Sequence, residues 1–274
     1  MVINMKIFKY IGLFFLICIT FFYTEKVINV TTNKDEIMIK IKEYESNYNI
    51  PPKNAIINND TIIPGTTGKY INSELSYKNM KKIGYFEPTL LIYEEIYPEI
   101  SIYNNYNKYI IKGNTQNKSI SLLYILNNDN TLDSILTITK KYNIKINFFI
   151  DSNFLNNNIN LIDNIKHHEL YNYGANGKYT KDNLIISNNI INNKSNNKSI
   201  FCLFINKNEK NLNNCVNNKM LSLITTPINF NQIKQSLSNG NFYLIDNTKE
   251  LSLIIEYIIT KGYNIVPLSE LITE

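Results

Sequence analysis

The stretch from residue 116 to residue 155 constrains the fold of this 274-residue chain more than any other. Residues 119–126 form a largely apolar run, which is typical of a strand buried on both faces. A polar loop at 127–130 follows, and the apolar periodicity from Thr131 predicts a helix that Thr131 caps. A second apolar run at 144–150 predicts another strand. A strand, a helix and a strand in this order predict a right-handed βαβ unit with parallel strands.

Two parts of the chain resemble the polysaccharide deacetylase family, whose catalytic unit is the NodB-homology domain. Residues 131–155, TLDSILTITKKYNIKINFFIDSNFL, are similar to its first helix and its strand of the form KYNIKATFF. Residues 241–271, NFYLIDNTKELSLIIEYIITKGYNIVPLSEL, are similar to its closing strand, helix and strand. The resemblance implies an α/β fold, an irregular and incomplete barrel of the (β/α)7 type, over residues 114–274.

The N-terminus carries a positive charge followed by a long apolar segment. Lys6 and Lys9 precede the apolar residues 10–23, and no small-residue cleavage pattern follows. This pattern favours an uncleaved transmembrane signal anchor at residues 1–24. The positive-inside rule then predicts a single-pass protein of the cell membrane, with the C-terminal domain outside the cytoplasm. Secretion after cleavage of the leader is the alternative.

Residues 25–113 are expected to form a small α+β extension. Amphipathic patterns predict helices at 35–48 and 73–83, and alternation predicts a strand within 89–102. This segment is similar to the extension that precedes the NodB-homology domain in membrane-anchored deacetylase-like proteins of Firmicutes.

Charge and cysteine usage narrow the function classes. The net charge of +5 is spread along the chain and forms no basic stripe, which argues against a nucleic-acid partner. Cys18, Cys202 and Cys215 show no spacing of a zinc site. Cys202 and Cys215 either pair in an oxidising compartment or remain unpaired as small apolar side chains, and the second interpretation is preferred.

The residues that would carry deacetylation are replaced in this chain. That reaction needs a carboxylate base, a divalent metal and a general acid. The resemblance implies an Asp-Asp pair after the first strand, two metal-binding His, an Arg-Pro-Pro-Tyr loop and a late acidic His. The residues at the Asp-Asp, His, His, Arg and late His positions are, in that order, Ile125 and Leu126, Tyr173, Gly177, Cys202 and Ile245. We therefore expect no metal and no other cofactor.

A few polar residues remain as candidates for chemistry. Asp129 lies in the loop after the first strand, and Asp246 follows the late strand. Asp246 either takes part in catalysis or caps the following helix. His167 and His168 are adjacent, so their side chains point in different directions and form a poor metal clamp. We interpret both histidines as surface or structural residues.

Two hypotheses follow. The favoured one is a catalytically degenerate deacetylase-like protein that binds a cell-wall polysaccharide or peptidoglycan. In it Tyr124, Tyr171 and Tyr173 line a groove that stacks on sugars, although they can equally fill the core. The alternative is an active metal-dependent N-deacetylase, a hydrolase on C–N bonds other than peptide bonds. It would need Zn²⁺ or another divalent metal and would recruit Asp129, His168 or Asp246. The count of metal ligands favours the first hypothesis.

Overall fold

The chain folds into two compact units. The computed structural model describes the backbone of residues 2–274 and the side chains of residues 10–24, 26 and 32–274. The smaller unit comprises the residues up to Pro51 together with Gly68–Ile96, and the larger unit comprises Pro52–Thr67 and Tyr97–Glu274. The division differs from the predicted boundary at residue 113, because residues 52–67 and 97–113 contribute strands to the larger unit.

The smaller unit contains three α-helices and a two-stranded antiparallel sheet among its described residues. These are α1 (Val2–Asn33), α2 (Glu36–Tyr48), β3 (Gly68–Ile71), α3 (Ser73–Lys81) and β4 (Tyr93–Ile96). The Asp35 carboxylate accepts a hydrogen bond from the backbone N–H of Ile37 at the start of α2 and pairs with Lys81 of α3 at 2.6 Å. The two predicted helices are thus confirmed, and the predicted strand is confined to β4.

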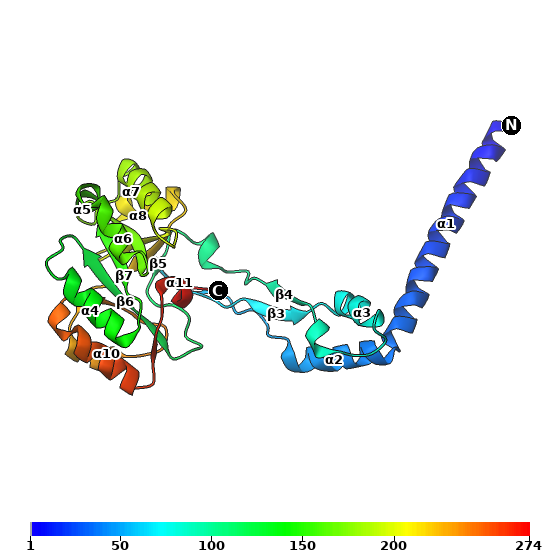
Figure 1. The fold of residues 1–274 in the computed structure, drawn as a ribbon. Coiled ribbons are helices and arrows are strands. Elements are labelled where there is room, and N and C mark those ends of the chain that lie inside the picture. The colour runs from blue at the N-terminus through cyan, green and yellow to red at the C-terminus, as the bar shows by residue number, and fades with distance from the viewer. Residues whose placement is uncertain (1) are drawn as a thin grey trace. The chain divides into compact units, whose positions relative to one another are not determined.

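Helix α1 continues past residue 24, where the predicted anchor ends, to Asn33 (Figure 1). Among the described residues, no helix is both long and apolar enough to cross a membrane. The structure therefore does not support the predicted transmembrane anchor. Lys6 and Lys9, which set its predicted orientation, lie outside the described side chains.

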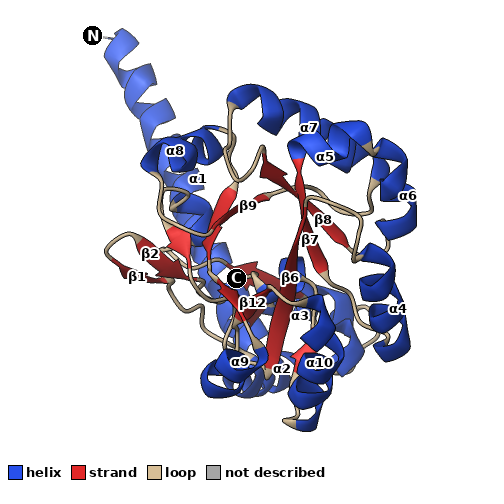
Figure 2. Ribbon diagram, turned by 90° about the vertical axis from the view of Figure 1, so that its left-hand side faces the viewer, coloured by secondary structure: helices blue, strands red, loops and turns tan. Residues whose placement is uncertain are grey.

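The larger unit is built on two sheets whose strands surround a shared interior, with helices on the outside (Figure 2). The first sheet is parallel and has the order β11-β12-β6-β7-β8, with β13 beside β6. Its strands are β6 (Ser119–Leu126), β7 (Asn147–Asp151), β8 (Glu169–Gly174), β11 (Pro227–Ile228), β12 (Phe242–Ile245) and β13 (Asn264–Ile265).

The second sheet has the order β1-β2-β5-β10-β9 and is parallel except for the β1–β2 hairpin. Its strands are β1 (Ile56–Asn58), β2 (Thr61–Ile63), β5 (Tyr109–Ile110), β9 (Phe201–Phe204) and β10 (Leu221–Ile224). The helices of the unit are α4 (Leu132–Tyr142), α5 (Ser152–Asn157), α6 (Ile162–Ile165), α7 (Lys181–Lys194), α8 (Glu209–Asn217), α9 (Phe230–Ser236), α10 (Leu251–Thr260) and α11 (Leu268–Leu271).

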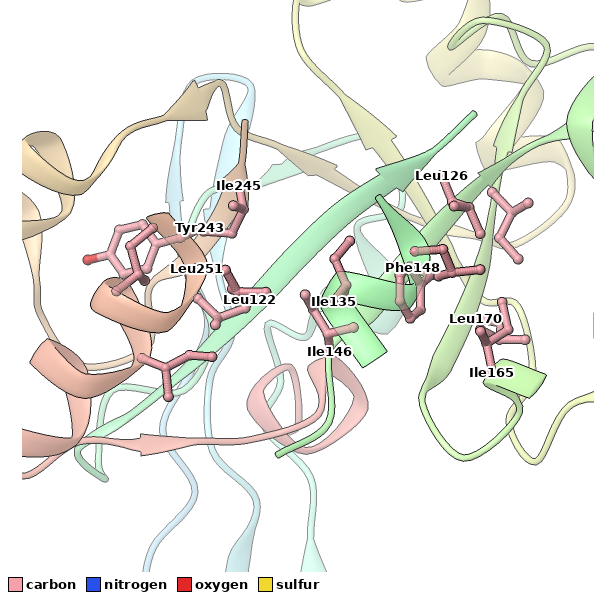
Figure 3. Close-up of a cluster of buried hydrophobic side chains, with 14 of the residues drawn as sticks. Leu122, Leu126, Ile135, Ile146, Phe148, Ile165, Leu170, Tyr243, Ile245 and Leu251 are labelled. Atoms are coloured by element: carbon pink, nitrogen blue, oxygen red, sulfur yellow. The ribbon is translucent and has the colours of Figure 1, made fainter. Parts of the chain in front are cut away.

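Strand β6 is buried on both faces, as its apolar run predicted. On the outer face, Leu122 and Leu126 join a cluster with Ile135 of α4 and Leu251 of α10 (Figure 3). On the inner face, Leu123 belongs to a second cluster with large aromatic side chains of β7, β8 and β9, namely Phe149, Tyr171 and Phe201. The β6–α4–β7 unit with parallel strands is therefore confirmed.

The start of α4 differs in detail from the prediction. Thr131 occupies the N-cap position, yet its side chain makes no capping hydrogen bond. Its hydroxyl is instead hydrogen-bonded to the Tyr124 hydroxyl at 2.8 Å. A tertiary contact with β6 has replaced the local cap that the sequence pattern favours.

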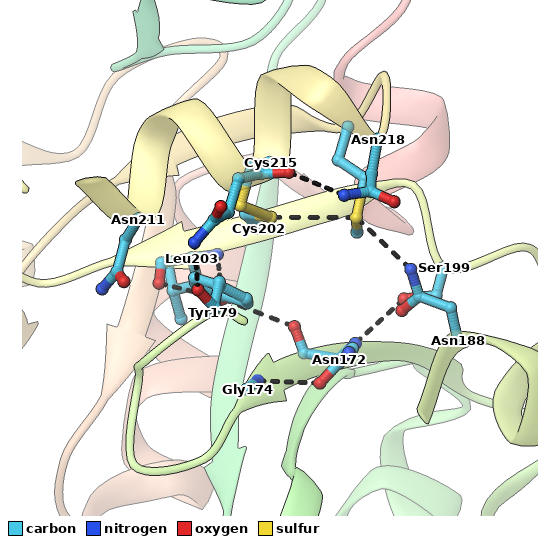
Figure 4. The surroundings of a disulfide bond; sticks show 12 residues. Asn172, Gly174, Tyr179, Asn188, Ser199, Cys202, Leu203, Asn211, Cys215 and Asn218 are labelled. Carbon is cyan, nitrogen blue, oxygen red and sulfur yellow. Dashed lines mark hydrogen bonds between the residues drawn. A yellow bond between two sulfur atoms is a disulfide. The ribbon is translucent and has the colours of Figure 1, made fainter. Parts of the chain in front are cut away.

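The two sheets meet without backbone pairing at a seam between β8 and β9, where side chains supply the hydrogen bonds. Ser199 Oγ accepts from the Asn172 N–H of β8 at 3.0 Å. The buried Tyr179 hydroxyl accepts from the Leu203 N–H of β9 at 2.8 Å, and burial raises the pKa of Tyr179 strongly (Figure 4). The strands β8 and β9 therefore belong to two separate sheets that are joined here through side chains.

Candidate functional site

A pocket of about 420 Å³ opens at the carboxyl ends of the strands in the larger unit. Parallel strands bring the residues that follow them to one edge, which is where α/β proteins most often place their sites. The pocket is lined by residues at the ends of β6, β8, β9 and β12 and by the start of β11, namely Tyr124, Ile125, Asn127, Tyr173, Asn176, Ile205, Pro227, Leu244, Ile245 and Asp246.

Three of the positions matched to catalytic residues of the deacetylases meet in this pocket. Ile125, Tyr173 and Ile245 all line it. Leu126 does not, because it is fully buried and packs in the outer cluster between the strands and the helices. Cys202 is also fully buried, in a strand that has every residue buried. Of these slots, Ile125, Tyr173 and Ile245 therefore line the pocket, whereas Leu126 and Cys202 lie in the core.

The residues present do not fit the divalent metal that the fold implies. Within the described part of the chain, no three His, Cys, Asp or Glu residues are grouped so that they could hold a metal ion. The second His position, Gly177, has a φ of +73°, and a Cβ there would lie 3.1 Å from the Tyr173 hydroxyl oxygen. A histidine at Gly177 would be strained, and Tyr173 would have to move to admit it.

Asp246 lines the pocket and Asp129 does not. Asp246 is exposed at the end of β12, and the residue that caps the following helical turn is Asn247, whose side chain accepts from the Lys249 N–H. The predicted capping role of Asp246 is thus wrong, since the cap falls one residue later. Asp129 lies in the exposed loop before α4, outside the pocket lining.

A further carboxylate, that of Asp151, escaped the sequence analysis. It is buried at the end of β7, where Oδ1 accepts from the Asn153 and Phe154 N–H groups at 2.9 and 3.2 Å. Oδ2 accepts from the N–H of Asn176, a pocket residue, at 2.5 Å. An Asp that ends an apolar strand and directly precedes a polar turn is a helix-capping signal that could have revealed it.

Tyr124 and Tyr173 lie in the pocket, as predicted for sugar-binding residues, but Tyr171 does not. Successive residues of a strand face opposite ways, so Tyr171 and Tyr173, which are two positions apart, share one face of β8. Tyr171 lies farther from the carboxyl end of β8 than Tyr173. It is fully buried, and its hydroxyl donates to the Glu169 carboxylate at 2.6 Å. Burial, together with the Glu169 charge, raises the pKa of Tyr171. The assignment of Tyr171 to the site is therefore corrected to a core role.

Tyr173 is half-buried at the pocket wall. Burial, and after it the negative charge of Asp151, raises its pKa. Its hydroxyl makes no hydrogen bond to another residue in the described part of the chain. Tyr124 is also half-buried, and its ring packs edge-on against Phe148 with centroids 6.1 Å apart. Tyr173 thus keeps a donor and an acceptor available to a ligand.

The two histidines are far along the strands from the pocket. His168 directly precedes β8 and is buried, and its Nδ1 accepts from the Ile146 N–H at 3.2 Å. Burial, followed by the charges of His167 and Lys145, lowers the pKa of His168 to about 4. Since His168 lies at the amino end of its strand and Asp246 follows the carboxyl end of a parallel neighbour, the fold does not bring them together. His168 is a structural residue and His167 is exposed, as predicted.

Cys202 and Cys215 form a disulfide between β9 and α8 (Figure 4). Of the two alternatives that the sequence left open, the structure therefore has the paired one, and the preference for unpaired cysteines is corrected. Their Cα atoms are 6.5 Å apart, a separation that a disulfide spans, because α8 packs directly on the strand that carries Cys202. Sequence spacing alone could not reveal this approach, since it depends on the docking of a helix against a sheet.

Comparisons with known proteins define the class of this fold. No family model matches the chain. The uncharacterized protein YlxY of Bacillus subtilis is 30% identical over 155 residues, which cover 54% of this chain and 48% of YlxY. The match thus spans about half the length of this relative.

Solved structures extend the similarity over most of the chain. The CE4 family pseudoenzyme BA3943 of Bacillus anthracis superposes with a TM-score of 0.62 and 22% identity, covering 88% of this chain and 96% of that chain. The Bc1960 peptidoglycan N-acetylglucosamine deacetylase superposes with a TM-score of 0.53 and 17% identity, covering 60% of this chain and 92% of that chain. The protein has the fold of the CE4 polysaccharide deacetylases, and the resemblance found in the sequence is confirmed at that level.

Proposed function

We propose that this protein is a polysaccharide deacetylase-like protein that lacks deacetylase activity and binds a glycan of the cell envelope. The single observation that carries the proposal is the composition of the pocket. It occupies the carboxyl ends of the strands and offers aromatic, amide and carboxylate side chains. It contains no histidine, and its one carboxylate cannot hold a metal alone.

The pocket suits a carbohydrate. Tyr124 and Tyr173 present aromatic rings that pack against apolar sugar faces, and Tyr173 adds a hydroxyl that no other described residue binds. Asn127 and Asn176 offer amide donors and acceptors for sugar hydroxyls. Similarity to a CE4 family pseudoenzyme and to a peptidoglycan deacetylase points to cell-wall polysaccharide or peptidoglycan as the ligand class.

The active-enzyme alternative finds less support. It requires Asp129, His168 or Asp246 to act together, yet Asp129 lies outside the pocket lining and His168 is at the opposite end of its strand. A mutant of the pseudoenzyme BA3943 is described as having restored enzymatic activity. In this chain Ile125, Leu126, Tyr173 and Gly177 stand at the Asp-Asp and His positions, and a side chain at Gly177 would be strained.

We further propose that the larger unit works outside the cytoplasm. Its support is the Cys202–Cys215 disulfide, because such bonds persist in oxidising compartments and are rare in the cytosol. Protease treatment of intact cells tests this location. Degradation of the larger unit without lysis is the expected result, and complete protection would refute it.

The function is tested on the full-length chain by calorimetric titration with chitin and peptidoglycan oligosaccharides, together with an acetate-release assay and metal analysis after dialysis against zinc. We expect saturable binding, no acetate release and no stoichiometric metal. Tyr173→Ala should weaken binding about tenfold or more, as expected for loss of a stacking and hydrogen-bonding side chain. Tyr85→Ala, at an exposed tyrosine of the smaller unit, is the matched control and should leave affinity unchanged. Acetate release, or metal lost on mutating Asp246, would overturn the proposal.

A further inference from the structure

The pocket and the whole chain carry opposite charge. The chain has a formal net charge of +5, yet the residues that line the pocket include the carboxylate of Asp246 and no Lys, Arg or His. A pocket without cations in its lining does not favour an anionic ligand, because solvent-exposed charges more than about 8 Å away are largely screened at physiological ionic strength.

A second negative charge lies beneath the pocket wall. Asp151 is buried, and it accepts from the backbone N–H of the pocket residue Asn176 at 2.5 Å. Its charge also acts on Tyr173, raising the pKa of that hydroxyl. Three backbone N–H groups donate to the Asp151 carboxylate. It therefore adds negative electrostatic potential to the pocket but is not available to bind a ligand.

Asp246 differs because its carboxylate is available. It is exposed at the pocket rim, and within the described part of the chain it makes no hydrogen bond or ion pair. Tyr124 and Tyr173 stand in the same pocket, and the faces of aromatic rings attract cations. A carboxylate, two phenol rings and two asparagine amides together suit a ligand with one ammonium group and several hydroxyls.

We infer that the pocket selects sugars carrying a free, protonated amino group over their N-acetylated counterparts. This inference rests on the proposed glycan-binding function and names the form of the glycan. The ammonium pairs with Asp246, while the amides and the Tyr173 hydroxyl bind sugar hydroxyls. An acetamido group is neutral and cannot form that ion pair, so the acetylated sugar loses this contribution.

The experiment compares three β-1,4-linked tetrasaccharides on the full-length protein by calorimetric titration: those of glucosamine, N-acetylglucosamine and glucose. Because the carboxylate is partly hydrated, we expect the glucosamine tetramer to bind roughly three- to tenfold more tightly than the other two. Asp246→Asn should remove this preference while retaining binding of the neutral sugars. Asp133→Asn, at another exposed aspartate, in the first turn of α4, is the matched control and should keep the preference.

The outcomes separate this inference from the function on which it rests. Binding of all three sugars with equal affinity, or a preference that survives Asp246→Asn, overturns the inference and leaves glycan binding intact. Failure of every sugar to bind overturns the proposed function itself. Weaker binding of the glucosamine tetramer at raised salt in the wild-type protein, with no such loss in Asp246→Asn, would support an ion pair.

Discussion

The two ends of the β6–β7–β8 sheet differ in the burial and hydrogen bonding of their polar side chains. At the amino end, Asn147, His168 and Glu169 are buried and each is hydrogen-bonded. At the carboxyl end, the pocket holds the apolar Ile125 and Ile245. Its rim carries polar groups that are open to solvent.

At the amino end, the buried polar side chains form hydrogen bonds that connect several elements. The Asn147 side chain donates to the Leu122 carbonyl and accepts from the Leu268 N–H, both at 2.8 Å, and so joins β6, β7 and α11. Glu169 accepts from the Tyr171 hydroxyl and from the Ser269 N–H. These contacts fasten the C-terminal helix beneath the sheet.

At the carboxyl end, by contrast, two polar side chains of the pocket make no hydrogen bond within the described part of the chain. Asp246 has no partner among the described residues, and the Tyr173 hydroxyl has none either. Buried polar groups that lack partners cost free energy, whereas exposed ones cost little. The comparison teaches that Asn147, His168 and Glu169 at the amino end maintain the fold, while Asp246 and Tyr173 at the carboxyl end are available for a ligand. Substitutions at the first end should change stability, and those at the second should change binding.

Asn147→Ala is expected to have the largest effect. It leaves the buried Leu268 N–H without its partner, which costs about 1–3 kcal/mol, and removes the hydrogen bond to the Leu122 carbonyl, which contributes about 0.5–1.5 kcal/mol. The free energy of unfolding should therefore fall by about 1.5–4.5 kcal/mol. Urea denaturation followed by circular dichroism measures it. Asn218→Ala, which removes an exposed side-chain contact to the Asn214 carbonyl, is the control and should cost under about 0.5 kcal/mol. A loss below about 1 kcal/mol at Asn147 would break the comparison.

Removal of the disulfide comes next. The bridge closes a loop with a sequence separation of 13 residues, and loss of such a bridge lowers the free energy of unfolding by about 3 kcal/mol. We expect the double substitution Cys202→Ala/Cys215→Ala to lower Tm and to abolish the effect of a reducing agent. Cys18→Ala is the control, because Cys18 is free. Equal Tm values with and without reductant in the wild-type protein would argue against the bond.

Acidification should weaken the amino end through His168. Its pKa is about 4 in the folded protein and 6.5 in the unfolded chain, so the unfolded chain binds the proton first as pH falls. Stability from this group is therefore complete above pH 6.5 and is lost between 6.5 and about 4, by roughly 2–3 kcal/mol.

The test measures unfolding free energy against pH for the wild type and His168→Gln. The slope over this range should disappear in His168→Gln, which cannot take up a proton. His167→Gln, at the exposed neighbour, should retain most of the slope. A slope that persists in His168→Gln would assign the pH dependence to other groups.

Two tyrosines on one strand give the smallest and sharpest contrast. Tyr171→Phe removes a donor from the buried Glu169 carboxylate and should cost about 1–2 kcal/mol with no change in glycan affinity. Tyr173→Phe removes a hydroxyl that binds no described residue, so it should cost under about 0.5 kcal/mol and weaken glycan binding several-fold. Denaturation and calorimetry on both variants measure the pair. The reverse pattern would place the site at Tyr171.

Much of the fold was predictable because its signals are local. The apolar run of β6 and the amphipathic pattern of α4 predicted a parallel βαβ unit that the structure confirms. The similarity of residues 241–271 to a closing deacetylase unit predicted β12, α10 and β13 in order. The sequence also predicted that the catalytic positions are replaced, because this depends only on which residue type occupies each position.

Only the tertiary structure decided which side chains meet. It separated Tyr173, which lines the pocket, from Tyr171, which is buried two residues earlier in the same strand. The local sequence pattern does not encode how far along the strand the interior ends and the pocket begins. It also joined Cys202 to Cys215 through the docking of α8 on β9, and it placed Asp151 beneath the pocket wall. Periodicity reports which face of an element is apolar. The partners of that face depend on packing between segments far apart in the sequence.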